Sequence, residues 1–203
     1  MCGILALFGD EVEVSSYLLS HRGPDAYHTK TIGKCRLDFY RLAINDLTSA
    51  GMQPFTEGNE MLICNGEIYN HREFRTGIEK SNSDCEVLLP LMKSYGMMKT
   101  LELINGDFSF VWTNGNRVMA ARDRVGVRPL FYTRYAHNSI AFASEVKALL
   151  FLRSEIHIFP PGHLYDSYIN DFVCYHTGYW RVNKYIKSGF HRQLRETFEH
   201  AVH

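Results

Sequence analysis

The sequence places a cysteine directly after the initiator methionine, in the run Met1-Cys2-Gly3. A cysteine in this position is usually incidental, because its side chain packs as a small hydrophobe. The alternative is specific. Removal of Met1 would leave Cys2 with a free α-amine whose pKa of about 7.7–8.0 suits a base near neutral pH. Nucleophile and base would then share one residue, and no separate histidine would be needed. On this segment alone both interpretations stay open.

Asn65, Gly66, Arg41 and Asp84 are further candidates. Asn-Gly is common in turns. However, an Asn amide and the backbone N–H of a following Gly can also point at one developing oxyanion. Arg41 ends an alternating segment and could hold a carboxylate through two hydrogen bonds, although an arginine on a strand is more often a solvated charge. Asp84 precedes a helical pattern and fits either a cap or a ligand. Each signal is weak alone.

Composition limits the classes of function. The 203 residues are 45% hydrophobic, and 22 Lys plus Arg balance 22 Asp plus Glu. Neither a basic excess nor a polybasic run favours binding to nucleic acid or to an anionic membrane, and no apolar stretch is long enough to span a bilayer. Five cysteines without a CxxC pair favour a reducing, cytoplasmic compartment over a disulfide scaffold. The ten scattered histidines give no zinc ligand spacing, so no metal is expected.

Short apolar or alternating runs bounded by turn residues predict a mainly antiparallel sheet protein with some helices. Asn114-Gly115-Asn116 predicts a tight hairpin between two of the strands. The predicted strands are Ile4–Phe8, Arg36–Ile44, Met61–Cys64, Phe108–Thr113, Val118–Arg122, Leu130–Tyr135 and Ile140–Ala143. Together these patterns indicate one α+β domain up to about Tyr175, followed by a tail helix.

Four segments have helical patterns, namely Val12–Ser20, His71–Ile78, Asp84–Tyr95 and a final stretch with Phe190, Leu194, Phe198 and Ala201 on one face. Ser83 followed by Glu86 predicts a capping box for the third helix. Pro90 inside that pattern predicts either a kink or a shifted start.

In order along the chain, these motifs resemble the class II glutamine amidotransferases. They are MCGI at 1–4, HRGPD at 21–25, RLAI at 41–44, QP at 53–54, NGEIYN at 65–70 and SDCE at 83–86, extended by RDRVGVRPLFY at 122–132, ASEVKAL at 143–149 and PPG at 160–162. RGPD and NGEIYN indicate, within that group, the glutaminase domain of the glutamine-hydrolysing asparagine synthetases.

The resemblance implies an N-terminal-nucleophile hydrolase fold, a four-layer αββα sandwich of two antiparallel sheets between helices. It also implies hydrolysis of L-glutamine to glutamate and ammonia through a γ-glutamyl thioester, without a cofactor. The positions that it assigns are Cys2 as nucleophile, Asn65 and Gly66 as oxyanion donors, Arg41 for the substrate α-carboxylate, Glu67 and Asp84 for the α-ammonium group, and Ile44 as a further substrate contact.

The same resemblance implies a glutaminase domain at residues 2–175, with 176–203 as a connection and the start of a synthetase domain. The phosphate-gripping SGGxDS segment of that domain does not occur in the sequence. ATP and Mg are therefore expected only through a synthetase domain or a subunit in trans. A catalytically silent glutamine-binding or regulatory module is the main alternative, and an acylase or proteasome-like peptidase is a third. The joint presence of nucleophile, oxyanion pair and charged clamp favours an active glutaminase.

Overall fold

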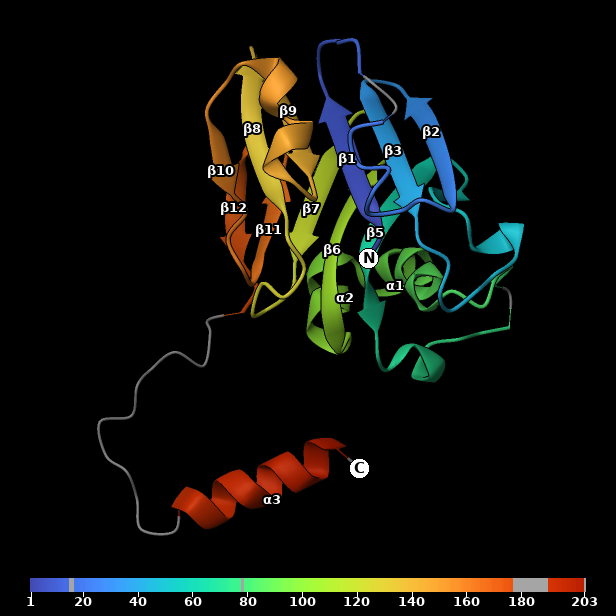
Figure 1. Ribbon diagram of the computed structural model, residues 1–203, viewed down its shortest axis with the longest axis vertical. Coiled ribbons are helices and arrows are strands. Elements are labelled where there is room, and N and C mark those ends of the chain that lie inside the picture. Colours follow the sequence, from blue (N-terminus) through green and yellow to red (C-terminus); the bar gives the residue numbers. More distant parts are fainter. Residues whose placement is uncertain (15–16, 78, 177–189, 203) are drawn as a thin grey trace.

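The computed structural model describes residues 1–14, 17–77, 79–176 and 190–202, and its body consists of two six-stranded antiparallel sheets (Figure 1). The first sheet has the spatial order β10 (Ile156–Ile158), β8 (Phe131–Ala136), β9 (Ser139–Ala143), β1 (Gly3–Phe8), β3 (Cys35–Arg41) and β2 (Ala26–Ile32). The second has the order β12 (Asp171–Cys174), β11 (His163–Asp166), β7 (Val118–Arg122), β6 (Gly106–Thr113), β5 (Glu60–Ile68) and β4 (Phe55–Glu57). The predicted sandwich of two antiparallel sheets is confirmed.

Side-chain alternation along β5 connects two parts of the core. Met61 and Ile63 pack between the sheets, beside Ile4 and Phe39 of the first sheet. Leu62 and Cys64 point the other way, toward the helices. Because successive side chains of a strand face opposite sides, Asn65 and Glu67 lie on the face of β5 that looks toward the first sheet.

Two helices cover the outer face of the second sheet. They are α1 (Leu88–Tyr95) and α2 (Met97–Leu103), and α1 follows a 3₁₀ turn at Asp84–Val87. The predicted helical region is confirmed, and so is the shifted start. Pro90 lies in the first turn of α1, where its missing N–H leaves no hydrogen bond unmade.

The capping box predicted for this region is wrong, because Ser83 makes no side-chain cap. The carboxylate of Glu86 instead accepts hydrogen bonds from Lys80 and Ser81 in the preceding loop, at 2.9 Å from the Lys80 nitrogen and 2.8 Å from the Ser81 nitrogen.

The outer face of the first sheet is covered differently from the prediction. The described parts of Val12–Ser20 contain no helix. Val12 and Val14 are half-buried while Glu11 and Glu13 are exposed, which is the period of an extended chain. Two 3₁₀ turns, Val146–Ala148 and Leu150–Leu152, cover the same face.

Other predicted segments differ mainly in extent. The region His71–Ile78 begins with a single 3₁₀ turn at His71–Glu73, and residue 78 lies outside the described chain. Beyond this turn, the Glu79 carboxylate accepts the N–H groups of Thr76 and Gly77. The hairpin at 114–116 is confirmed, with Gly115 at φ +87°.

The final predicted helix is confirmed as α3 (Phe190–Val202), and its side chains Phe190, Leu194 and Phe198 are exposed. Residues 177–189 of the connection predicted within 176–203 fall outside the described residues, so the domain boundary near residue 175 stays a prediction. Among the helices of the described ranges, none is long and apolar enough to cross a membrane.

Candidate active site

One cavity of about 140 Å³ brings together all seven predicted site residues. They come from the start of β1, the end of β3 and the segment after it, the distal half of β5, and the first residue of the 3₁₀ turn before α1. The seven residues are Cys2, Arg41, Ile44, Asn65, Gly66, Glu67 and Asp84. Segments up to 82 residues apart in sequence thus converge on one site, with the nucleophile candidate on one sheet and the oxyanion candidates on the other.

The thiol of Cys2 lies against the main chain just beyond β3. Its Sγ accepts a hydrogen bond from the Leu42 N–H at 3.4 Å and lies 3.5 Å from the Leu42 carbonyl oxygen. Burial raises the pKa of the Cys2 thiol, although the Leu42 N–H and the charge of the N-terminal amine act in the opposite direction. The thiol is therefore protonated near neutral pH, and an attack by Cys2 needs a base to take the proton.

The position of Cys2 is fixed through its own carbonyl. Arg22, in the HRGPD segment, donates from Nε to the Cys2 oxygen at 3.0 Å. An ion pair with Glu145 at 3.2 Å holds the other end of the Arg22 guanidinium. Gly23 lies beside it, and any Cβ there would come within 2.1 Å of the Tyr40 oxygen, so glycine is required at this corner.

Asn65 and Gly66 lie within β5, and not in a turn that ends the strand. The Asn65 side chain is only 1% exposed, and its Nδ2 has no acceptor within hydrogen-bond reach in the described chain. A buried unpaired amide donor is costly, and here it belongs to a residue that lines the cavity. Gly66 packs against β6, where an added Cβ would lie 2.4 Å from the Asp107 oxygen.

Arg41 is buried and already has two local partners. Its NH1 donates to the Thr48 carbonyl at 2.6 Å, and its NH2 donates to the Asp46 carbonyl. The guanidinium thus fixes the loop after β3, and its remaining N–H groups are left for the cavity. The sequence prediction missed this second task, because the partners are backbone carbonyls that carry no residue signature.

The carboxylates form the other charged side of the cavity. Asp84 is buried, with Oδ1 accepting from Asn45 Nδ2 at 2.8 Å and Oδ2 accepting from the Ile68 N–H at 2.7 Å. Glu67 is exposed at the rim, and so is Ile44, which is 70% exposed. Arg41, Glu67 and Asp84 thus line a small cavity together with neutral donors, a set that could hold a zwitterion with an uncharged polar end. Asp46 and Arg128 are further charged residues of the lining.

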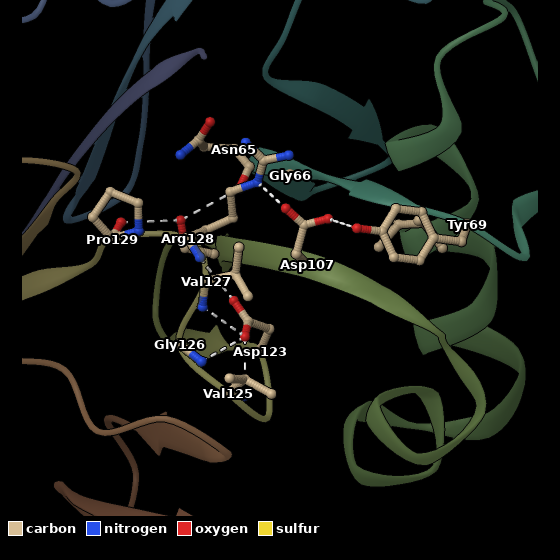
Figure 2. A network of polar contacts seen from close by, with 12 residues as sticks. Asn65, Gly66, Tyr69, Asp107, Asp123, Val125, Gly126, Val127, Arg128 and Pro129 are labelled. Atoms are coloured by element: carbon tan, nitrogen blue, oxygen red, sulfur yellow. Dashed lines mark hydrogen bonds and ion pairs between the residues drawn. The ribbon is translucent and has the colours of Figure 1, made fainter. Parts of the chain in front are cut away.

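Arg128 also lines this cavity, and the sequence prediction did not single it out. Figure 2 shows Asp107 between Arg128 and Tyr69. Arg128 Nε lies 2.5 Å from Asp107 Oδ2, while the Tyr69 hydroxyl donates to Asp107 Oδ1. That bond, with burial, raises the pKa of Tyr69 to about 12. The only sequence signal for Arg128 is its place in the RDRVGVRPLFY motif.

Asp123 orders the loop that carries Arg128 (Figure 2). Its carboxylate accepts four successive backbone N–H groups, those of residues 125 to 128, over distances of 2.6 to 3.0 Å. Arg128 therefore reaches the cavity from a loop whose backbone is held by one buried carboxylate.

In comparisons with known proteins, residues 1–180 match the family model described as a glutamine amidotransferase domain. The asparagine synthetase [glutamine-hydrolyzing] of Zea mays is 36% identical over 220 residues, covering 100% of this chain and 37% of that protein. A probable asparagine synthetase [glutamine-hydrolyzing] of Dictyostelium discoideum is 37% identical, covering 100% of this chain and 41% of that protein. The chain therefore spans about two fifths of the length of such relatives.

Among solved structures, the glutamine phosphoribosylpyrophosphate amidotransferase of B. subtilis superposes with a TM-score of 0.70 at 20% identity. The match covers 87% of this chain and 50% of that chain. At this level of identity the likeness establishes a shared fold, an arrangement of two antiparallel sheets with few helices.

Proposed function

Because this chain belongs to the family of glutamine amidotransferase domains, we propose that it hydrolyses L-glutamine by a covalent route that begins at Cys2. The curated relatives that it resembles are glutamine-hydrolysing asparagine synthetases, and we infer that it corresponds to their glutaminase part. The geometry of the cavity supports specific roles for the residues that line it.

The proposed reaction starts with the removal of Met1, which exposes the α-amine of Cys2. The amine takes the proton of the thiol, and Sγ attacks the side-chain carbonyl carbon of glutamine. The resulting oxyanion accepts hydrogen bonds from Asn65 Nδ2 and the Gly66 N–H. Collapse of the intermediate returns the proton to the leaving nitrogen, releases ammonia and leaves a γ-glutamyl thioester. Water then breaks the C–S bond, which yields glutamate and free Cys2.

The unpaired Nδ2 of Asn65 is the observation that carries this proposal. A fold rarely retains a buried donor without an acceptor, and such a donor is explained when the acceptor forms only during the reaction. Binding energy that appears only in the transition state accelerates the chemical step. A catalytically silent module would have no use for this donor beside a nucleophile.

The charges of the cavity support glutamine as the substrate. We propose that Arg41 binds the α-carboxylate, that Glu67 and Asp84 bind the α-ammonium group, and that Ile44 contacts the substrate at the rim. Glutamate would bring a negative charge to the reacting end, where the Asn65 amide and the Gly66 N–H are neutral donors, and we expect the cavity to favour glutamine. No cofactor takes part in these steps.

The wider role is also a proposal. We infer that the released ammonia serves the conversion of aspartate to asparagine, because the curated relatives are named for that product. ATP and Mg would be bound by a synthetase domain or by a subunit in trans, with residues 176–203 as the connection to it.

The test is a glutaminase assay on the chain after intact mass has confirmed the loss of Met1. The processed protein should release glutamate and ammonia in equal amounts, and Cys2→Ala should release neither. Glutamine binding without hydrolysis in the processed protein would favour the silent module. Hydrolysis of acyl or peptide substrates in preference to glutamine would favour another N-terminal-nucleophile hydrolase.

A further inference from the structure

Beyond Leu62, the edge of β5 has no neighbouring strand within the described chain. β4 contributes only three residues, with Phe55 opposite Leu62 and Glu57 opposite Glu60. In an antiparallel pair, the N–H and C=O groups of every second residue face the same edge. Positions 60, 62, 64, 66 and 68 therefore face the β4 side, and the last three of them lie where β4 no longer runs.

Side chains take the place of the missing strand. The carboxamide of Gln53 accepts the Cys64 N–H at 2.6 Å and donates to the Cys64 carbonyl at 3.2 Å. Continuing the register of β4 places position 53 opposite Cys64, so the side chain replaces the main chain of a strand. Further along, Cys85 Sγ lies 3.7 Å from the Gly66 carbonyl, and Asp84 accepts the Ile68 N–H.

This arrangement accounts for both backbone groups of Cys64, for the Gly66 carbonyl and for the Ile68 N–H. Of the N–H groups at positions 64, 66 and 68 on this edge, those of Cys64 and Ile68 have side-chain acceptors, and we infer that the Gly66 N–H is left for a ligand. Cys64 directly precedes Asn65, so Gln53 fixes the strand at the residue before the two oxyanion donors. Gln53 is itself 4% exposed and lines the cavity, and its main-chain carbonyl oxygen lies 3.2 Å from His28 Nδ1.

From this geometry we infer that Gln53 is a positioning residue for the oxyanion hole. It holds β5 at Cys64, so that the Asn65 amide and the Gly66 N–H meet the same oxygen. The inference rests on the proposed function. A displacement of about 1 Å at a catalytic group can cost about 100-fold in rate, and the loss of two hydrogen bonds directly before the donor pair permits such a displacement.

The test compares Gln53→Met with Phe55→Leu, a substitution in β4 that disturbs the same edge of β5 at a residue that does not line the cavity. Three quantities are measured on each processed protein: the single-turnover rate of ammonia release from glutamine, the inhibition constant of L-norvaline, and the thermal unfolding midpoint. L-norvaline carries the zwitterionic end of the substrate but no amide, so it reports ground-state binding alone.

Gln53→Met should release ammonia at least about tenfold more slowly, with an inhibition constant for L-norvaline within about twofold of the wild-type value. Phe55→Leu should lower the unfolding midpoint and leave the rate of ammonia release unchanged. Gln53→Glu keeps an acceptor for the Cys64 N–H and should retain part of the rate, which provides the test if Gln53→Met does not fold.

A wild-type rate of ammonia release in both Gln53→Met and Gln53→Glu would overturn the inference. If Gln53→Met does not fold, a wild-type rate in Gln53→Glu alone would overturn it. Equal losses of rate and of L-norvaline binding would also overturn it, because they indicate a general collapse of the site. A wild-type protein without glutaminase activity would instead count against the proposed function, so the two failures are distinguishable.

Discussion

Replacing Asn65 by alanine should separate catalysis from stability. The Asn65 amide nitrogen is buried and makes no hydrogen bond in the described chain. Its removal therefore breaks no native hydrogen bond of that atom, and it relieves a desolvation penalty of about 1–3 kcal/mol. If the nitrogen is an oxyanion donor, kcat should fall by about 10²–10³, equivalent to about 2.7–4 kcal/mol of lost transition-state stabilisation. The free energy of unfolding should stay constant or rise.

The assay is steady-state glutamine hydrolysis, paired with urea unfolding of the same preparation. KM should change little, because the zwitterionic end of the substrate is expected to bind Arg41, Glu67 and Asp84 and not Asn65. A fall in kcat without a fall in stability is the signature of a group that acts only in the transition state.

Thr113→Val provides the matched control. Thr113 is fully buried on the neighbouring strand β6, and its hydroxyl donates to the Arg117 carbonyl at 2.8 Å. The same hydroxyl accepts the Gly115 N–H at 3.0 Å, so losing both bonds should cost about 2 kcal/mol of stability with kcat unchanged. The reasoning would be refuted if Asn65→Ala kept wild-type kcat, or if it lost stability as Thr113→Val does and kcat only in proportion to unfolded protein.

Three further predictions concern the nucleophile, the clamp and the loop. In protein that retains Met1, the alkylation rate of Cys2 should increase with pH, and the midpoint of that increase should lie above the ordinary thiol pKa of 9.0, because burial favours the neutral thiol. Peptide mass spectrometry after iodoacetamide treatment measures this rate, and a midpoint below 9.0 would contradict the prediction. Arg41→Lys should raise KM for glutamine by about tenfold and also lower stability in urea, since the loop carbonyls lose their donors. Asp123→Asn should cost about 3 kcal/mol in urea unfolding, because four N–H groups lose a charged acceptor; a loss under 1 kcal/mol would contradict it.

The residues that converge on the cavity were more readily predicted from the sequence than the elements that carry them. Cys2, Asn65 and Arg41 are recognisable from residue type and motif, and the structure brings them to one cavity. The strand β2 was missed, because Ala26–Ile32 lies at the edge of the sheet with mostly exposed side chains and shows no alternation of apolar and polar residues. The helix predicted at Val12–Ser20 failed because two half-buried valines at a spacing of two fit an extended chain better.

Contacts to backbone groups could not be predicted. The side chains of Gln53 and Asp84 make hydrogen bonds to main-chain atoms of β5. Any residue type other than proline at those positions of β5 would offer the same main-chain atoms. A motif such as QP at 53–54 therefore marks a position of interest, but it does not indicate which main-chain groups the Gln53 side chain binds. The register of the sheet, which depends on the whole sandwich, identifies Cys64 as the residue opposite Gln53.

The placement of the reacting groups on two sheets has a consequence for the whole core. Cys2 precedes β1 of the first sheet, whereas Asn65 and Gly66 belong to β5 of the second. Their separation is set by the inter-sheet packing of residues such as Ile4 and Ile63, which are both fully buried. Because close-packed cores transmit volume changes, the proposed reaction should depend on the sandwich interior as well as on the cavity. The side chains at the open edge of β5 then adjust the donors locally, while the core fixes the distance over which the thiol must act.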